Sequence, residues 1–230
     1  MIARAFEEAI RAQLAAGTSA RLSLDQLCDA CAEVASLGTS IVLSAEGRIQ
    51  AAIAATQSAV AVEDLQFKLG EGPGVDAYFE GRPILIGDLP AASSRWMHFV
   101  PGATALGIGA VFAYPLQLGA IRVGVLSMYA NRLCIPEDGQ LREMAELANL
   151  VTDAVLAMQS GVPTEELGVP LAGAADHRAV VQQAIGAIAM QLECSPRDAL
   201  ARLRARAFAE GVDLDDVAYG VVQGRTRFER

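Results

Sequence analysis

Four arginines fall within residues 197–206 of the stretch SPRDALARLRARAF, although the chain has a formal net charge of −9. Arginine suits phosphate because its planar guanidinium presents several N–H donors in a fixed arrangement. From Asp176 onward, eight basic residues balance eight acidic ones, so the first 175 residues carry the whole net charge. The cluster therefore indicates either a phosphate-binding face or an ordinary solvated face of a helix.

Residues Ser195, Pro196 and Asp198 predict the start of a helix, because serine caps helices, proline suits the first turn and an acid completes the cap. At about 100° per residue, one apolar arc of this helix would contain Leu200, Leu203, Ala207 and Phe208.

The arginines separate on this helix. Arg202 and Arg206 lie outside the apolar arc and are predicted to face solvent. Arg204 lies inside the arc, where a guanidinium must reach water or find an acid. Asp215 and Asp216 follow at the predicted start of the next helix, so we expect one of them to form a structural ion pair with Arg204.

Groups for catalysis or metal binding are sparse. Cys28 and Cys31 form a C-x-x-C pair in an apolar helical pattern, and no second cysteine or histidine pair is near, so a structural role is favoured over a metal or redox role. His98 leaves haem ligation open, although a hydrogen-bonded or exposed histidine is the simpler interpretation. The stretch GEGPG lacks the Gly-Lys-Ser/Thr ending of a phosphate loop. We therefore expect no enzyme activity, no metal and no cofactor.

Composition predicts two folded parts. With 53% hydrophobic residues the chain can form real cores. Residues 161–175, GVPTEELGVPLAGAA, contain two prolines and three glycines and are predicted to be a linker between domains 1–160 and 176–230. No run approaches the roughly 18 apolar residues of a membrane span, and the N-terminus lacks a signal peptide's apolar centre. We expect a cytoplasmic protein with no membrane partner.

The first part alternates between helical and strand patterns. Helices are predicted near 3–15, 22–37 and 137–160, and strands at TSIVLS, RIQAAIA, PILIG, AVFAYPL and IRVGVLSMYA. These elements predict an α+β domain with one antiparallel sheet, covered by helices on one face. The segment 55–108 is predicted as a long irregular insert over the other face.

Eight of the chain's twelve aromatic residues lie between positions 67 and 129. They can form a solid core, or they can wall a pocket for a mainly apolar small molecule. The candidate pocket residues are Phe67, Trp96, Phe99, Phe112 and Tyr129.

Helix 137–160 has two neighbouring apolar stripes. The first steps by three and four residues through Leu141, Met144, Ala148, Val151, Val155 and Met158. The second contains Leu147, Leu150 and Ala154. Either the helix has one wide buried face, or it also contacts its own copy in a homodimer.

Three amphipathic helices are predicted after the linker, one of them being the arginine-rich stretch. The first has an apolar stripe of Val181, Ala184, Ile185, Ile188 and Leu192. The last has a stripe of Leu214, Val217, Ala218 and Val221. Together they predict a small all-α three-helix domain.

The first domain resembles the GAF family of small-molecule sensor domains over roughly residues 20–160. The resemblance rests on LQFKLGEGPGVDAYFEGRPILIGDL, on RWMHF after it, and on GAVFAYPLQLGAIRVGVLSMYA. It implies a ligand pocket over the sheet, closed by a loop and short helices. No motif identifies the ligand.

The stretch RAVVQQAIGAIAMQLECSPRDALARLRARAFAEGVDLDDVAYGVV resembles the ANTAR family over nearly its full length. The resemblance implies a dimeric domain, controlled by an attached sensor, that binds RNA hairpins of nascent transcripts, not DNA, and prevents terminator formation. GAF followed by ANTAR is a combination typical of actinobacteria. The candidate RNA-binding residues are Arg178, Arg197, Arg202, Arg206, Arg225 and Arg227.

One position departs from the ANTAR pattern. Where the family often has lysine, this chain has Ile185, so a basic residue that could approach phosphate is missing. RNA affinity is then either weakened or rests more on Arg202, Arg206 and the tail arginines. The hypothesis is a signal-responsive antiterminator, and the alternative is a protein–protein interaction module that binds no RNA.

Overall fold

A computed structural model describes the chain except for residues 1, 17–21, 46–47, 120, 162–173 and 229–230. It divides into two compact units, Met1–Gly168 and Val169–Arg230. Most of the predicted linker lies outside the described residues.

The first unit is built on a five-stranded antiparallel sheet, ordered β2-β1-β5-β4-β3. All five predicted strands are present. They are β1 (Gly38–Ala45), β2 (Arg48–Ala54), β3 (Ile84–Ile86), β4 (Ala110–Leu118) and β5 (Ile121–Ala130). The central strand β5 pairs Leu126 with both Ile41 of β1 and Tyr114 of β4. Residues 124–130 of β5 are all buried, as expected for a strand in a sheet that is covered on both faces.

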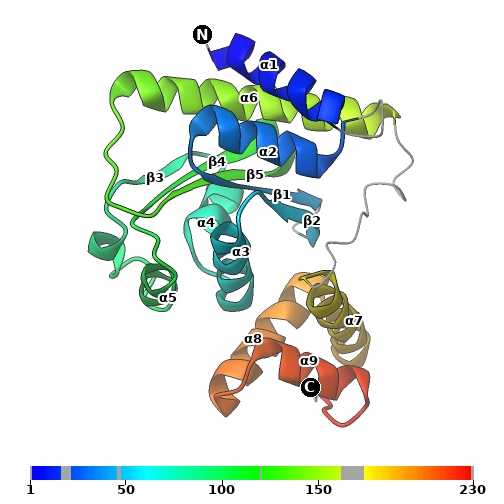
Figure 1. The fold of residues 1–230 in the computed structure, drawn as a ribbon. Coiled ribbons are helices and arrows are strands. Elements are labelled where there is room, and N and C mark those ends of the chain that lie inside the picture. The colour runs from blue at the N-terminus through cyan, green and yellow to red at the C-terminus, as the bar shows by residue number, and fades with distance from the viewer. Residues whose placement is uncertain (1, 17–21, 46–47, 120, 162–173, 229–230) are drawn as a thin grey trace. The chain divides into compact units, whose positions relative to one another are not determined.

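One face of the sheet carries the helices predicted at the two ends of the domain. These are α1 (Ile2–Ala16), α2 (Leu24–Ala35) and α6 (Asp138–Gly161), which lie together above the sheet in Figure 1. Ser23 caps α2 and Gln26 returns the bond, so the two side chains form a capping box.

The other face is also covered by helices, so the prediction of an irregular insert was wrong. Residues 55–108 contain, besides β3, the helices α3 (Gln57–Leu69), α4 (Pro73–Glu80) and α5 (Phe99–Ala105) and the 3₁₀ turn η1 (Pro90–Ala92), which lie below the sheet in Figure 1. The buried face of α3 includes the polar residues Glu63 and Gln66, which interrupt its apolar period. Helices α4 and α5 have only eight and seven residues, too few for a clear period. Gly70 and Gly81 have positive φ and end α3 and α4.

Helix α6 packs its first apolar stripe against its own domain. Ala148, Val151 and Val155 are buried, and the hydroxyl of Tyr114 in β4 donates to the carbonyl of Leu141. The part of the first stripe around Val151 and Val155 is therefore a face buried within the domain, and it is not available for contact with a second chain.

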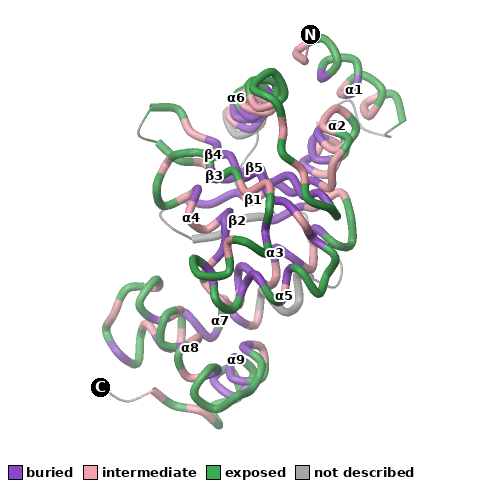
Figure 2. Tube along the Cα trace, turned by 90° about the vertical axis from the view of Figure 1, so that its left-hand side faces the viewer, coloured by how far each residue is buried: buried purple, intermediate pink, exposed green. Residues whose placement is uncertain are grey.

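The second unit contains α7 (Ala174–Leu192), α8 (Pro196–Glu210) and α9 (Leu214–Val222). Purple buried residues alternate with green exposed ones along these helices in Figure 2. All residues of the apolar stripes predicted for the first and last of these helices are buried. They are Val181, Ala184, Ile185, Ile188 and Leu192 in α7, and Leu214, Val217, Ala218 and Val221 in α9. Ser195 caps α8 by accepting from the Asp198 amide, as predicted.

Candidate functional site

Helix α8 packs through a narrower face than its sequence suggested. Ala199, Leu203 and Ala207 are buried, whereas Leu200 is only half-buried and Phe208 is 75% exposed. The spacing of four residues lets small alanines on both sides of Leu203 bring the neighbouring helices close. The apolar arc derived from the largest side chains was therefore wrong for Phe208.

Because the buried face of α8 differs from the predicted apolar arc, the surroundings of Arg206 also differ from the prediction. Its Nε lies 2.7 Å from Oε1 of Glu210, and its Nη1 donates to the carbonyl oxygen of Arg227 at 3.1 Å. Its guanidinium carbon is 5.3 Å from the ring centroid of Phe228, a cation–π distance. The Phe228 amide in turn donates to Gln191 in α7. Arg206 is thus half-buried against the C-terminal tail, and the prediction that it faces open solvent was wrong.

Arg204 is half-buried, as its place inside the predicted arc implied. Burial lowers the pKa of its guanidinium to about 10, so the group remains charged at neutral pH. Asp215 is half-buried and Asp216 is exposed at the start of α9. The ion pair of Arg204 with one of these acids stays a prediction.

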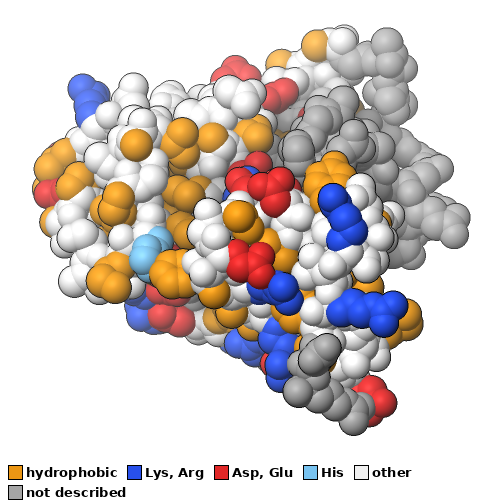
Figure 3. Space-filling model, turned by 90° about the horizontal axis from the view of Figure 1, so that it is seen from below, with side chains coloured by type: hydrophobic (Ala, Val, Ile, Leu, Met, Phe, Trp, Pro, Cys, Tyr) orange, Lys and Arg blue, Asp and Glu red, His pale blue; other side chains and the backbone are white. Residues whose placement is uncertain are grey.

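Four of the candidate arginines have exposed side chains: Arg197, Arg202, Arg225 and Arg227. Figure 3 shows arginine or lysine side chains, in blue, next to exposed hydrophobic ones, in orange. Arg178 lies in α7, but its side chain is outside the described part of the structure. Ile185 is buried, so this position contributes to the core of the unit and offers no phosphate contact.

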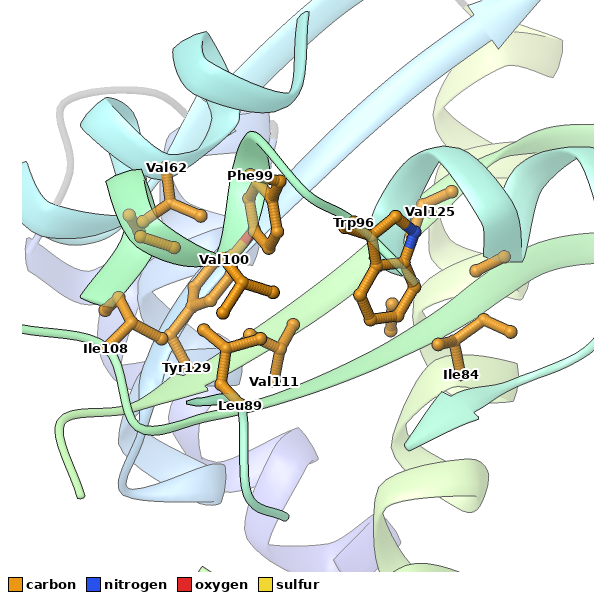
Figure 4. Close-up of a cluster of buried hydrophobic side chains, with 14 residues drawn as sticks. Val62, Ile84, Leu89, Trp96, Phe99, Val100, Ile108, Val111, Val125 and Tyr129 are labelled. Atoms are coloured by element: carbon orange, nitrogen blue, oxygen red, sulfur yellow. The ribbon is translucent and has the colours of Figure 1, made fainter. Parts of the chain in front are cut away.

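In the first unit, three of the five candidate pocket residues share one hydrophobic cluster. Trp96, Phe99 and Tyr129 pack there with aliphatic side chains of α3, η1 and the sheet, and Figure 4 shows them over the same face. The rings of Trp96 and Phe99 meet edge to face, with centroids 6.3 Å apart. These residues serve as core, and a ligand beside them stays a prediction.

Phe112 lies on the opposite face of the sheet. Its neighbours Val111 and Ala113 belong to the cluster with Trp96, and strand residues alternate between faces. Phe112 therefore points to the side of Tyr114, which bonds α6. The prediction that Phe112 walls the same pocket was wrong. Phe67 is buried in α3, on the helix face that also carries Val62 and Gln66.

A buried polar network, which the sequence reasoning missed, joins α3 to the sheet. Glu63 accepts from the hydroxyls of Tyr129 and Ser40, the second at 2.6 Å. Burial and the Glu63 carboxylate raise the pKa of the Tyr129 phenol well above its ordinary value, so it stays a neutral donor. Glu63 is only 8% exposed. Because a buried acid needs hydrogen-bond donors, the hydroxyls of Ser40 and Tyr129 stabilise it.

The network continues toward α4. Gln66 donates to the Tyr129 hydroxyl at 3.4 Å and accepts from the Gly74 amide at 2.7 Å. The buried Ser127 hydroxyl lies near Tyr129 but makes no well-formed hydrogen bond among the described residues. A useful signal was Glu63 itself, because it follows Ala59 and Val62 on the apolar face of a helix. An acid at such a position needs buried donors.

The GEGPG stretch has a structural part. Glu71 accepts from the amides of His98 and Phe99, at 2.7 and 2.8 Å, and so caps the start of α5. Gly72 has φ +136°, and a side chain there would collide with Gln66. These contacts give Glu71 and Gly72 structural roles in the turn between α3 and α4.

An ion-paired corner lies beside it. Asp76 accepts from Arg95 at 2.7 Å and from the indole nitrogen of Trp96 at 3.2 Å. The Arg95 guanidinium also lies 4.6 Å from the Trp96 ring centroid. The exposed rim of this corner holds the buried indole in place, so these charged residues have a structural role.

The cysteines of the C-x-x-C pair are buried in α2. Burial raises the pKa of the Cys28 thiol to about 12 and raises that of Cys31 further. Cys28 approaches backbone carbonyls of Thr39 and Ile53. Neutral thiols make poor nucleophiles and metal ligands. Among the described residues, no group of three His, Cys, Asp or Glu could hold a metal ion.

No helix in the described ranges is long and apolar enough to cross a membrane.

Family models match both parts of the chain. The model described as GAF domain matches residues 20–155, and the model described as ANTAR domain matches residues 171–222. The chain belongs to the GAF family, with an ANTAR domain after the GAF domain. GAF domains are sensors and ANTAR domains bind RNA in antitermination, so both are regulatory families. Among curated proteins, none matches the sequence.

Solved structures with a similar fold have low sequence identity. The GAF domain of a phosphoenolpyruvate-protein phosphotransferase from Coxiella burnetii is 13% identical, with a TM-score of 0.46, over 69% of this chain and 95% of that one. The corresponding Acinetobacter domain is 13% identical, with a TM-score of 0.45, over 68% and 96%. Free methionine-R-sulfoxide reductase from Neisseria meningitidis is 16% identical, with a TM-score of 0.44, over 70% and 92%. Likeness at this level carries no information about activity.

Proposed function

We propose that this protein is a cytoplasmic, non-enzymatic regulator that binds RNA hairpins of nascent transcripts through its ANTAR domain and so prevents termination. The observation that carries the proposal is the set of exposed arginines, Arg197 and Arg202 on α8 and Arg225 and Arg227 on the tail. Guanidinium groups on one small unit can bind several phosphates of a hairpin. The unpaired loop then offers bases that side chains can read.

The GAF domain is proposed to control this binding in response to a small molecule. Support comes from the buried network of Glu63, Tyr129 and Gln66, which places polar groups inside an otherwise apolar layer. A ligand that enters between α3 and the sheet would replace some of these bonds. Its polar group would have to donate to Glu63, while its apolar part would contact the cluster around Trp96.

A homodimer beside α6 is part of the proposal. Since Val151 and Val155 are buried within one chain, the contact would use the second stripe, where Leu150 and Ala154 are only half-buried. Two such helices would meet in an isologous interface.

The alternative function, a protein–protein interaction module without RNA binding, is favoured by two observations. Ile185 is buried at the position where the family often has a basic residue. In addition, the segment from Asp176 onward has no net charge.

Crosslinking of RNA to the full-length protein in its native host, followed by sequencing, tests the proposal. We expect enrichment of transcript segments that form a hairpin ahead of a terminator. Binding of these hairpins to the purified protein should weaken with salt, with a slope of about 0.7 in log affinity per phosphate contact to a single strand. Recovery of no specific RNA, together with salt-insensitive binding, would favour the interaction module.

A further inference from the structure

Phe208 is a large aromatic side chain that α8 leaves 75% exposed, directly after the buried Ala207. A single exposed phenylalanine needs no special explanation. Its neighbours on the helix surface make this one informative.

Phe208 ends a row of four residues along one side of α8. Arg197, Ala201, Arg204 and Phe208 are separated by four, three and four positions, a spacing that places side chains next to each other on a helix. The row is about 16 Å long. Arg197, Ala201 and Phe208 are exposed and Arg204 is half-buried. The row thus combines an aromatic ring, a small side chain and two guanidinium groups, with no acid among its four members.

We propose that Phe208 stacks on an unpaired base of the bound RNA, while Arg197 and Arg204 bind the adjoining phosphates. The inference rests on the RNA-binding function proposed above and assigns the residue that contacts the base. Aromatic rings stack on any base because both have flat π faces, and cationic side chains beside the ring hold the backbone. Ala201 leaves room for the sugar and phosphate to approach the helix between the two arginines.

An RNA base fits this row better than an apolar side chain of a protein. A protein partner would have to present acidic side chains to the two arginines and an apolar side chain to the ring. A nucleotide supplies both parts at once, since each base is joined to a phosphate. Arg204 is also held in place by its partial burial, so less side-chain freedom is lost when it binds.

The experiment uses the full-length protein and the hairpin recovered by crosslinking. Ultraviolet irradiation of the complex, digestion with trypsin and mass spectrometry should find a nucleotide attached to the peptide 207–225, at Phe208. Replacing loop positions one at a time with 2-aminopurine should identify one base whose fluorescence is quenched by the protein. Quenching should be lost in Phe208→Ala and kept in Phe208→Tyr.

Affinity separates stacking from charge. Phe208→Ala should weaken hairpin binding by roughly 5- to 100-fold, the loss expected for one stacked base, without changing the salt slope. Arg197→Ala should instead reduce that slope by about 0.7. Phe79→Ala is the matched control, because Phe79 is a 46% exposed phenylalanine in the sensor domain. It should leave binding unchanged.

Two results would overturn the inference while leaving the proposed function intact. One is hairpin binding by Phe208→Ala that equals that of the unmodified protein. The other is a clear fall in melting temperature of Phe208→Ala, which would show that the ring packs against another part of the protein. If no RNA binds even the unmodified protein, the proposed function fails as well, and pull-down of a protein partner lost in Phe208→Ala would assign the row to protein binding.

Discussion

The guanidinium of Arg206 lies over the ring of Phe228, with 5.3 Å between its central carbon and the ring centroid. The same group pairs with Glu210 and donates to the carbonyl of Arg227. One arginine of α8 therefore holds the end of the chain against the helical unit. Arg202, four residues earlier, is exposed. Two arginines that the sequence places together have different roles in the structure.

Arg206→Ala should lower stability more than Arg202→Ala. The first removes an ion pair, a hydrogen bond and a cation–π contact, each worth on the order of 0.5–1 kcal/mol at a partly exposed site. Arg202→Ala should change the free energy of unfolding by no more than about ±0.5 kcal/mol, as usual for surface substitutions. Thermal unfolding of the two variants measures the difference. Equal melting temperatures would show that the tail contributes nothing to the fold.

Arg202→Ala should instead affect RNA. It should weaken hairpin binding and reduce the salt slope by about 0.7, the value for one phosphate contact. Arg225→Ala serves as a comparison from the tail, because its side chain is also exposed. An unchanged slope in both variants would remove these residues from the RNA contact.

Tyr129 predicts a loss of stability at high pH. Its folded pKa is raised well above 10 by burial and by Glu63, whereas the unfolded phenol ionises near 10. The folded state therefore keeps a proton that the unfolded state has lost. The stabilisation is complete below pH 10 and falls as pH rises from there toward the folded pKa.

Denaturant unfolding of Tyr129→Phe at pH 8 and at pH 10.5 tests this. The variant should be less stable at pH 8 by about 1–3 kcal/mol, because Glu63 loses a buried donor. Between pH 8 and pH 10.5, the free energy of unfolding should decrease less for the variant than for the unmodified protein. Burial also raises the pKa of Tyr114, to about 12. Tyr114 should therefore cause part of the decrease in stability in both proteins.

The sequence predicted more of the sheet than of the helices over it. The five strands were found because each is a β-rich run bounded by turns, and β2 and β5 have the predicted ends. Helices α3 and α5 were not predicted. The buried face of α3 includes the polar residues Glu63 and Gln66, which interrupt its apolar pattern, and α5 has only seven residues. Phe208 was predicted in the core because large apolar side chains are usually buried, whereas in α8 the small residues Ala199 and Ala207 are buried and Phe208 is exposed. The contacts of Glu63 with Ser40 and Tyr129 join residues far apart in the chain, and no local pattern reports such pairings.

Helix α6 predicts opposite outcomes for two neighbouring positions. Val151→Asp should unfold the first domain, because it places an unpaired charge in the core. Leu150→Asp should leave the domain folded and separate a homodimer into monomers, since Leu150 is only half-buried. Circular dichroism and light scattering at micromolar concentration distinguish the two effects. If the unmodified protein is already monomeric there, the proposed dimer contact is wrong.

Arg204 tests whether a half-buried guanidinium is paired. If Arg204 forms the predicted ion pair with Asp215, removing either partner should lower stability, by about 1–3 kcal/mol for a partly buried charged bond. Arg204→Met keeps the apolar stem and removes the charge, and Asp215→Asn keeps the size of the acid. A double-mutant cycle should give a coupling of at least about 0.5 kcal/mol, with Asp216→Asn as the control because Asp216 is exposed.

The contribution of Arg204 to stability should depend on pH with the opposite sign to that of Tyr129. Burial lowers the folded pKa of Arg204 to about 10, below its unfolded value, so between these two values the unfolded state binds more protons and this group adds stability as pH rises. A coupling near zero, together with an Arg204→Met variant as stable as the unmodified protein, would contradict a stabilising ion pair between Arg204 and Asp215.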